Sequence, residues 1–372
     1  MEKRKILFAH LGSFSHINNA VLNSFHSIFK EYEIETIDLK ILLKKMSLKD
    51  KIILSLNTLL ISKNLNPKSI KGNLMKSPYF WNLSNRLIKK AAKNKDYIFT
   101  FQTQSNFDGK ISNSPHYIYT DHTHLVNLEY PGFLKKNLNV NSWQKKENEF
   151  YKKSQGIFTM SNHVKNSLLI QYQIEPSLVR CVFAGANITK ENVIYPLSRY
   201  QNKKILFVGV DWERKGGPEL FEAFKILIQK HPDAKLDIVG CNPNLNFPNV
   251  TIWGRLPIQE VKKHYESASI FCMPSKREPF GIVYLEAMAY KLPIVALKIG
   301  ALPDLVEEGK TGFLVNFKDN HLMAEKLNIL LDQPSLAKEM GEIAYQKVES
   351  QYNWESSVLA IKEHIISQGF LK

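Results

Sequence analysis

Two glutamates eight positions apart, Glu278 and Glu286, have the type and surroundings of a ligand site. The short apolar run 269–274 precedes them and predicts a buried strand, and apolar residues at helical spacing from Ile282 onward predict a helix. Pro279 disfavours helix at the residue before it, so Glu278 lies in the loop between the two elements. A strand, a loop with a glycine and a helix N-terminus form an arrangement in which backbone amides bind phosphate.

The two carboxylates cannot share one side of the helix, because Glu278 precedes it and Glu286 lies about a turn and a half inside it. We expect them to contact different parts of one extended ligand, whose anionic middle rests on the amides of residues 280–283. A nucleotide-diphosphate sugar has this shape, since its diphosphate lies between a ribose and a sugar. The alternative is a surface loop before an ordinary amphipathic helix, which leaves the acidic loop directly behind a buried strand unexplained.

The stretch from Glu278 to Ala289 resembles the signature of two glutamates separated by seven residues in retaining GT-B glycosyltransferases of family 4. The resemblance implies an α/β fold of two Rossmann-like, doubly wound domains that face a cleft, with a C-terminal helix that crosses back to the first domain. It implies transfer of a hexose from a nucleotide-diphosphate sugar to a hydroxyl acceptor, with retention at the anomeric carbon. The resembling enzymes need no metal and no other cofactor, and we expect a UDP- or GDP-linked donor.

The resemblance also assigns roles within this stretch. Glu278 would contact the hydroxyls of the donor sugar, and Glu286 the hydroxyls of the ribose. A carboxylate suits both tasks, because it accepts two hydroxyl hydrogen bonds at once and bonds to a charged acceptor are the stronger ones. Phe280, Gly281 and Ile282 would face the diphosphate.

The loop after the predicted strand 204–208 is the expected source of positive charge. The family places an arginine after the first glycine of this loop and a Lys-Gly pair at its end; Lys215 matches the lysine, but Val210 occupies the arginine position. Arg214 is therefore the candidate for the missing cation, since fixed positive charge stabilises the charge that grows on a departing diphosphate. The alternative for both cations is a solvated turn, but Gly216 and Gly217 directly before a helix favour phosphate binding.

A cluster of ionisable residues, Asp121, His122 and His124, follows the predicted strand 115–120. Open α/β sheets bind ligands at the carboxyl ends of their strands. The family has His-Thr or Asp-x-Thr at this place, facing the transferred sugar and the acceptor, so Asp121 and His122 are both candidate catalytic residues beside Glu278. A metal site on the three residues and a structural role for His124 are the alternatives.

Weaker matches concern four further residues. Gly12 and Ser13 follow the first predicted strand, where the family approaches the donor phosphates and the acceptor, but the loop lacks a full dinucleotide fingerprint. Arg255, with Leu256, matches the segment that flanks the nucleotide base.

The length of 372 residues suits two domains. We predict an acceptor-binding domain over residues 1–195, a nucleotide-sugar-binding domain over 196–352 and a final helix over 353–372 that packs on the first domain. The domain boundary falls in a polar linker, 189–202.

The apolar run near the start is too short for a signal peptide, no run reaches the length of a membrane helix, and the three cysteines have no metal-like spacing. We therefore expect a cytoplasmic protein with reduced cysteines.

The positive charge is concentrated in the N-terminal half. Residues 1–195 contain 28 Lys and Arg against 14 Asp and Glu, a net charge of +14, whereas residues 196–372 contain 22 against 21, a net charge of +1. Such asymmetry favours a polyanionic partner, but no RNA-binding motif or zinc module supports nucleic acid. Segment 39–61 alternates apolar residues with lysines at helical spacing, which predicts one helix, and Trp81 and the lysines of 89–95 extend the same argument. Core packing and peripheral contact with the inner face of an anionic cell membrane both remain open for this segment.

Other functions fit the same sequence. A nucleotide-sugar epimerase or a phosphorylase can share the two-domain fold, and product formation without an acceptor would favour the epimerase. Val210 also leaves open a basic, non-catalytic protein that resembles a glycosyltransferase, although Lys215, Glu278 and Glu286 argue for catalysis. The sequence does not show which base, sugar or acceptor is used.

Overall fold

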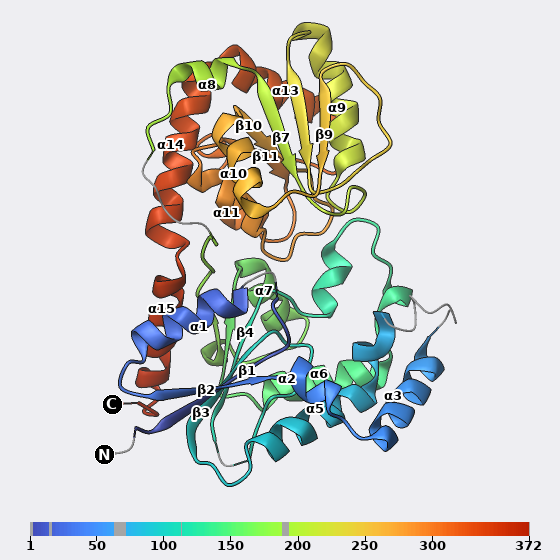
Figure 1. Cartoon of the computed structure of the whole chain (residues 1–372), viewed down its shortest axis with the longest axis vertical. Helices are drawn as coiled ribbons and strands as arrows, with labels where there is room; N and C mark the ends of the chain where they lie inside the picture. Colours follow the sequence, from blue (N-terminus) through green and yellow to red (C-terminus); the bar gives the residue numbers. More distant parts are fainter. Residues whose placement is uncertain (1–2, 15–16, 63–71, 113, 188–192, 372) are drawn as a thin grey trace. The chain divides into compact units, whose positions relative to one another are not determined.

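The computed structural model describes residues 3–14, 17–62, 72–112, 114–187 and 193–371 (Figure 1). Contacts divide the chain into two compact units. Unit 1 comprises Met1–Leu128, Phe133–Phe183 and Trp354–Lys372, and unit 2 comprises Glu129–Gly132 and Ala184–Asn353. The chain thus enters unit 2 at Ala184, ahead of the boundary expected at residue 195, and residues 189–192 of the predicted linker lie outside the described residues.

Unit 1 is built on a six-stranded parallel sheet in the order β2-β1-β3-β4-β5-β6. Its strands are β1 (Lys5–His10), β2 (Glu33–Asp38), β3 (Tyr97–Thr103), β4 (His116–Thr120), β5 (Gly156–Thr159) and β6 (Val179–Cys181). Its α-helices are α1 (Ile17–Ile28), α2 (Leu39–Lys44), α3 (Leu48–Ile61), α5 (Pro78–Ala91), α6 (Asn141–Lys152), α7 (Asn162–Ile170) and α15 (Trp354–Ser367). Its inner strands are nearly continuous apolar runs, as expected for parallel strands that are covered on both faces.

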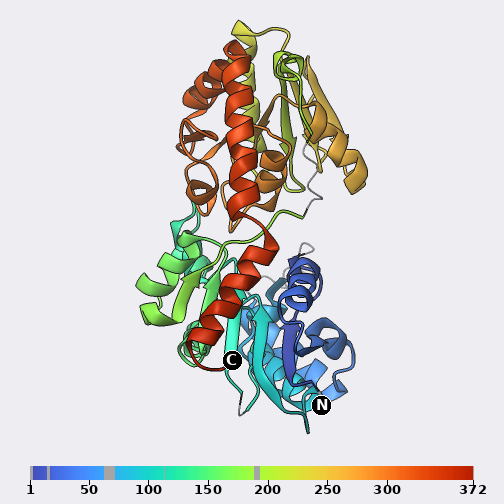
Figure 2. The same ribbon diagram turned by 90° about the vertical axis from the view of Figure 1, so that its left-hand side faces the viewer.

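The C-terminal helix α15 belongs to unit 1, as predicted, and packs against α1 (Figure 2). Lys362 Nζ donates to the carbonyl oxygen of Ile28 at 2.8 Å and to Glu31 Oε1 at 2.6 Å. The last segment of the chain is therefore fixed to the first helix of the same unit.

Unit 2 has a second six-stranded parallel sheet, in the order β12-β11-β10-β7-β8-β9. Its strands are β7 (Lys204–Val208), β8 (Lys235–Val239), β9 (Val250–Gly254), β10 (Ile270–Cys272), β11 (Ile294–Leu297) and β12 (Gly312–Val315). Its helices are α8 (Leu197–Gln201), α9 (Gly217–Lys230), α10 (Ile258–Ser267), α11 (Ile282–Ala289), α12 (Leu302–Leu305), α13 (Asn320–Asp332) and α14 (Pro334–Gln351). Two doubly wound α/β units are thus confirmed.

Segment 39–61 is two helices, and not the single helix predicted. Ser47 separates α2 from α3: its hydroxyl accepts from the Asp50 N–H at 3.1 Å and donates to Asp50 Oδ2 at 2.8 Å. No glycine or proline marks this break, so the apolar spacing alone did not reveal it.

Trp81 favours core packing, one of the two alternatives left open for this part of the chain. Its side chain is buried and packs edge to face on Trp143 and on Phe150, with both pairs of ring centroids 5.4 Å apart. The indole is therefore part of the core, whereas Lys89 and Lys90 near the end of α5 are exposed.

In the described part of the chain, no helix is both long and apolar enough to cross a membrane. The three cysteines form no disulfide; Cys241 and Cys272 are buried, and Cys181 is partly exposed.

Candidate active site

The strand order of unit 2 has a switch point between β7 and β10. β7 pairs with β8 on one side and with β10 on the other, because the connection after β9 returns across the sheet. Open parallel sheets bind ligands outside the carboxyl ends of their strands at such a point. Lys215 lies in the loop after β7 and Glu278 in the loop after β10, so two predicted site residues follow the two strands at the switch point.

Lys215 and Glu278 form a largely buried ion pair. Lys215 Nζ lies 2.6 Å from Glu278 Oε2, and the two side chains are 12% and 7% exposed. A buried carboxylate needs a partner that offsets its lost hydration, and Lys215 supplies one. Since these residues are 63 positions apart, the sheet topology brings them together.

Two helices begin beside this ion pair. α9 follows Gly216 (φ +75°) and α11 follows Gly281 (φ +99°), and neither helix has a side chain that caps its first turn. A Cβ atom on Gly216 would lie 1.9 Å from the carbonyl oxygen of Pro274, so only glycine fits where the two loops meet. The first N–H groups of a helix have no partner within it. In α11 the Tyr284 N–H already donates to the carbonyl oxygen of Gly281 at 3.0 Å, which leaves the amides of Ile282 and Val283 for a ligand. The ring of Phe280 is buried, so its predicted contact with the diphosphate falls to its backbone.

Arg214 bridges the two loops. Its Nη1 donates to the carbonyl oxygen of Arg277 at 3.1 Å, and its Nε lies 3.3 Å from Asp211 Oδ2. Val210, which occupies the family's arginine position, is exposed and brings no charge. Arg214 therefore lies close enough to belong to the same site, but Asp211 offsets its charge, and its role as the second cation stays a prediction.

Glu286 lies at a pocket of about 280 Å³ between α10 and α11. Tyr265 Oη donates to Glu286 Oε2 at 3.2 Å, and the rings of Tyr265 and Tyr290 stack with centroids 5.3 Å apart. Burial raises the pKa of Glu286 to about 7, against the opposing effect of the Tyr265 hydrogen bond. A carboxylate in a pocket with aromatic walls can accept a pair of hydroxyls, which is compatible with the predicted ribose contact.

Arg255 and Leu256 lie in the connection between β9 and α10 and are not among the described residues that line the Glu286 pocket. The pocket is lined instead by the first turns of α10, through Ile258, Gln259, Val261 and Lys262. The predicted base contact of Arg255 thus stays a prediction.

The loop after β1 in unit 1 is held through Asn18. Gly12 (φ +64°) donates its N–H to Asp38 Oδ1 at 2.9 Å, and its carbonyl oxygen accepts from Asn18 Nδ2 at 2.6 Å. Asn18 Oδ1 accepts from Thr103 Oγ1 at 2.6 Å, which ties this loop to the end of β3. Ser13 is exposed next to it. The loop is fixed at Gly12 and open at Ser13, and the expected approach of both to a ligand stays a prediction.

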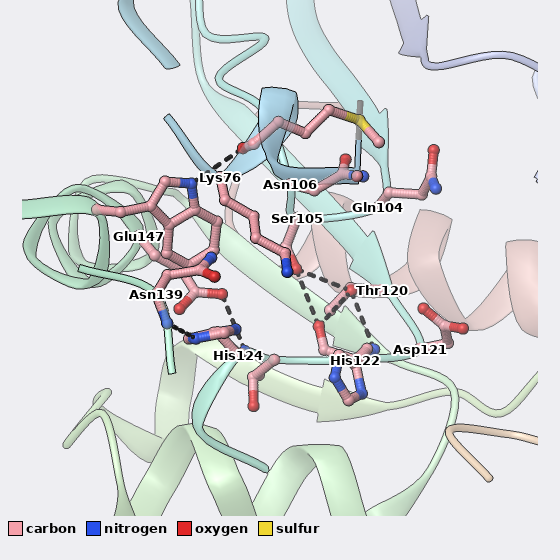
Figure 3. Close-up of a pocket in the computed structure, with 14 residues that line it drawn as sticks. Lys76, Gln104, Ser105, Asn106, Thr120, Asp121, His122, His124, Asn139 and Glu147 are labelled. Carbon is pink, nitrogen blue, oxygen red and sulfur yellow. Dashed lines mark hydrogen bonds between the residues drawn. The ribbon is translucent and has the colours of Figure 1, made fainter. Parts of the chain in front are cut away.

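A pocket of about 240 Å³ lies at the carboxyl ends of β3 and β4 and brings Asp121, His122 and His124 together (Figure 3). His124 Nε2 accepts from the N–H of Asn139 at 2.7 Å. Burial, together with the nearby Lys76 ammonium, lowers the pKa of His124 to about 4. His124 is therefore neutral near pH 7 and holds a backbone group, which favours the structural alternative for this residue. The described residues contain no group of three or more His, Cys, Asp or Glu side chains that could hold a metal ion.

Sequence reasoning missed Glu147, a fully buried carboxyl group at the base of this pocket. Glu147 Oε1 accepts from the N–H of His124 at 3.1 Å, and Oε2 accepts from Tyr172 Oη at 2.5 Å. Tyr172 Oη in turn accepts from the N–H of Leu125 at 2.9 Å. Glu147 and Tyr172 thus hold two consecutive amides of the loop that follows Asp121 and His122.

A signal for Glu147 was present in the sequence. Trp143, Glu147, Phe150 and Tyr151 recur at intervals of four, three and one residues, so the glutamate lies on the apolar side of α6. Most residues of 142–153 are polar, which hid this position.

Stability should depend on pH through Glu147. Burial raises its pKa to about 8, so the folded chain keeps a proton that the unfolded chain loses near pH 4.5. This stabilisation is complete below pH 4.5 and falls as pH rises toward 8, by up to about 1.4 kcal/mol per pH unit. Glu147→Gln, which is neutral at every pH, should flatten the fall in urea midpoint between pH 5 and pH 8. Glu149→Gln, on the exposed side of the same helix, is the matched control, and parallel profiles for Glu147→Gln and wild type would contradict the assignment.

Residues 196–347 match the family model of glycosyl transferases group 1. This range contains Lys215, Glu278 and Glu286. A curated relative, the sulfoquinovosyl transferase SQD2 of Arabidopsis thaliana, is 33% identical over 177 residues, which cover 45% of this chain and 34% of the relative. The chain spans 34% to 61% of the length of the first curated relatives it matches.

Solved structures are similar over nearly the whole chain. Sucrose-phosphate synthase from Thermosynechococcus elongatus aligns with a TM-score of 0.69 and 16% identity, over 99% of both chains. Anabaena HepE in complex with UDP aligns with a TM-score of 0.63 and 14% identity, over 98% of this chain and 100% of that one. These similarities establish the predicted GT-B fold.

Proposed function

We propose that this chain is a retaining glycosyltransferase that moves a hexose from a nucleotide-diphosphate sugar to a hydroxyl acceptor. The observation that carries the proposal is the buried Lys215–Glu278 pair beside the uncapped N-terminus of α11, at the switch point of the unit 2 sheet. The match to the glycosyl transferases group 1 supports it, as does the UDP present in the structure of Anabaena HepE.

In this proposal the donor lies along the ends of β7 and β10. Its diphosphate accepts from the amides of Phe280, Gly281 and Ile282 and from Lys215, with Arg214 as an additional cation. An ammonium group has three N–H donors, so Lys215 can bind a phosphate oxygen and keep Glu278. Glu278 then accepts from hydroxyls of the donor sugar.

The ribose of the donor is assigned to the Glu286 pocket. Tyr265 already holds one oxygen of Glu286, which orients the carboxylate toward the pocket. We assign the nucleotide base to the side of Arg255. Gly12 and Ser13 are proposed to approach the donor phosphates. UDP is the first nucleotide to test.

Chemically, the bond from the anomeric carbon to the diphosphate oxygen breaks, and the acceptor oxygen bonds to the same face of that carbon. The acceptor hydroxyl gives its proton to the departing phosphate oxygen, so the reaction consumes no cofactor. Negative charge grows on the diphosphate as the bond breaks, and Lys215 and the α11 amides stabilise it. Asp121 and His122, in the pocket of unit 1, are the proposed residues for the acceptor side.

We also propose that unit 1 associates peripherally with a membrane. The net charge of +14 over residues 1–195 supports peripheral association of unit 1 with an anionic bilayer surface, which would bring the enzyme to acceptors held there.

A thermal-shift comparison of UDP-, GDP- and ADP-sugars tests the donor assignment. One nucleotide class should raise the melting temperature, because a ligand that binds only the folded chain stabilises it by about 2.7 kcal/mol at a hundred times its Kd. For a unit of this size, that corresponds to roughly 5–10 °C.

The matched control is Glu286→Gln, which removes the proposed ribose contact and should reduce the shift for the preferred donor. Melting temperatures unaffected by all three classes would contradict the proposal. A sugar product formed without any acceptor would instead favour the epimerase.

A further inference from the structure

Helix α3 exposes an unusual amount of apolar surface on one side. Leu48, Ile52, Leu56 and Leu60 are 73%, 52%, 55% and 85% exposed. They recur every four residues, so they form one continuous stripe along the helix, which Leu59 widens. We call these five residues the apolar stripe.

The stripe is not the side by which α3 packs on the protein. Leu54 and Thr58 are buried, and Leu54 belongs to a core cluster with residues of α5 and the sheet. Asp50 accepts from Tyr79 Oη of α5 at 2.7 Å and pairs with Arg86. Figure 1 shows α3 on the side of α5 away from β1, β2 and β3. These contacts fix the rotation of α3, so that the apolar stripe faces outward.

Unbalanced positive charge lies on α3 and on the segment that leads into it. Lys49 and Lys51 are exposed on α3, and Lys40, Lys44 and Lys45 are exposed in α2 and at the residue that follows it. None of them forms an ion pair with a described residue, whereas both acids of the segment are engaged. Asp38 caps α2 and accepts from Gly12, and Asp50 pairs with Arg86. The apolar stripe therefore shares α3 with two of these cations and is preceded in the chain by three more.

We propose that α3 is the element by which unit 1 docks on an anionic lipid bilayer, with the apolar stripe in the acyl boundary and the lysines at the head groups. A helix with this combination lies in the plane of the interface, where apolar burial and attraction to anionic lipid add together. A patch of this kind would be costly in water without a partner, and the charge favours an anionic one. The inference rests on the membrane association proposed above and assigns it to specific residues.

Vesicle sedimentation of the full chain tests this assignment. The vesicles are phosphatidylcholine alone, or equal parts of phosphatidylcholine and phosphatidylglycerol. Leu56→Ser/Leu60→Ser should weaken binding to the anionic vesicles by about tenfold or more. The variant loses the favourable free energy of moving two largely exposed leucine side chains from water into the bilayer. Lys49→Gln/Lys51→Gln should weaken it by about fivefold per lysine at low salt, and by less as salt rises.

Matched controls come from the same unit. Ile170 is 75% exposed on α7, and Lys30 is exposed after α1, so Ile170→Ser and Lys30→Gln make the same chemical changes outside α3. Both should bind vesicles like wild type, and all variants should keep the wild-type melting temperature, because the altered side chains are exposed.

Three results would overturn the inference. If the Leu56→Ser/Leu60→Ser variant bound like wild type, α3 would not be the element that contacts the bilayer, although membrane association itself would not be contradicted. Absence of wild-type binding to anionic vesicles would refute both, while the donor thermal shift would still test transfer separately. A lipid-free dimer that the same variant dissociates in ultracentrifugation would assign the apolar stripe to a second copy of the chain.

Discussion

Glu278→Gln should lower kcat for glycosyl transfer by about a hundredfold or more, with a smaller change in the KM of the donor. Glutamine keeps the shape of the side chain and still offers Lys215 a carbonyl oxygen, so unit 2 should remain folded. It loses the charge that is paired with Lys215 at 2.6 Å and the ability to accept strongly from two sugar hydroxyls. Steady-state kinetics with the donor found by thermal shift would measure the change.

A second ion pair between the same segments provides the control. Lys276 Nζ lies 2.9 Å from Glu219 Oε1 and joins the loop after β10 to the first turn of α9. Glu219→Gln therefore weakens the same connection without altering the proposed donor site, and its kcat should stay close to that of wild type. Equal losses of kcat in Glu219→Gln and Glu278→Gln would mean that both ion pairs only hold the two loops together, and that Glu278 does not contact the donor.

Lys215→Met separates the two members of the pair. If Lys215 stabilises the leaving diphosphate and orients Glu278, the double variant should lose less than the product of the two single losses. Full kcat in Glu278→Gln at saturating donor would refute the assignment of this site.

Much of the fold could be predicted from local patterns. Buried parallel strands are continuous apolar runs such as residues 204–208 and 294–297, and these do not depend on distant residues for their interpretation. The helix break at Ser47 could not be read in this way, because a hydroxyl cap within a lysine-rich segment leaves the apolar spacing intact.

The residues of the candidate site were easier to predict than the contacts between them. Lys215 and Glu278 each follow a strand in a recognisable motif, but their pairing depends on β7 and β10 being neighbours, a property of strand order. The sequence left two positions open for the buried Trp81, since an aromatic residue between lysines has the same spacing whether its side chain points inward or outward.

Buried polar residues were the hardest to identify. Arg199 lies in the segment predicted to be a polar linker. Residues 197–201 of this segment form α8, and the guanidinium group of Arg199 is buried. Arg199 Nε, Nη1 and Nη2 donate to the carbonyl oxygens of Ala268, Tyr290 and Tyr265 at 2.7, 2.8 and 2.6 Å. These acceptors lie at the C-terminal ends of α10 and α11, where unpaired carbonyl groups favour a cation. One side chain therefore anchors two helices from a distant part of the sequence.

Arg199→Met should destabilise unit 2 by about 3 kcal/mol or more, because it leaves three buried carbonyl groups without their donor. A fall of roughly 6–12 °C in melting temperature is expected for a unit of this size. Arg199→Lys should recover only part of the loss, since an ammonium group lacks the planar fork that reaches all three acceptors. Arg255→Met, an exposed arginine of the same unit, is the stability control and should melt like wild type.

The Arg199 prediction also extends to donor binding. Tyr265 and Tyr290, whose carbonyl groups Arg199 holds, line the Glu286 pocket, and the Tyr265 hydroxyl orients the Glu286 carboxylate. Below its melting temperature, Arg199→Lys should therefore raise the KM of the donor more than it lowers kcat, since it loosens the proposed ribose contact and leaves Lys215 and Glu278 in place. Hydrogen exchange should become faster at the ends of α10 and α11 before it does so in the sheet. An Arg199→Lys variant that melts earlier but keeps the wild-type KM would separate the anchor of these two helices from the donor pocket.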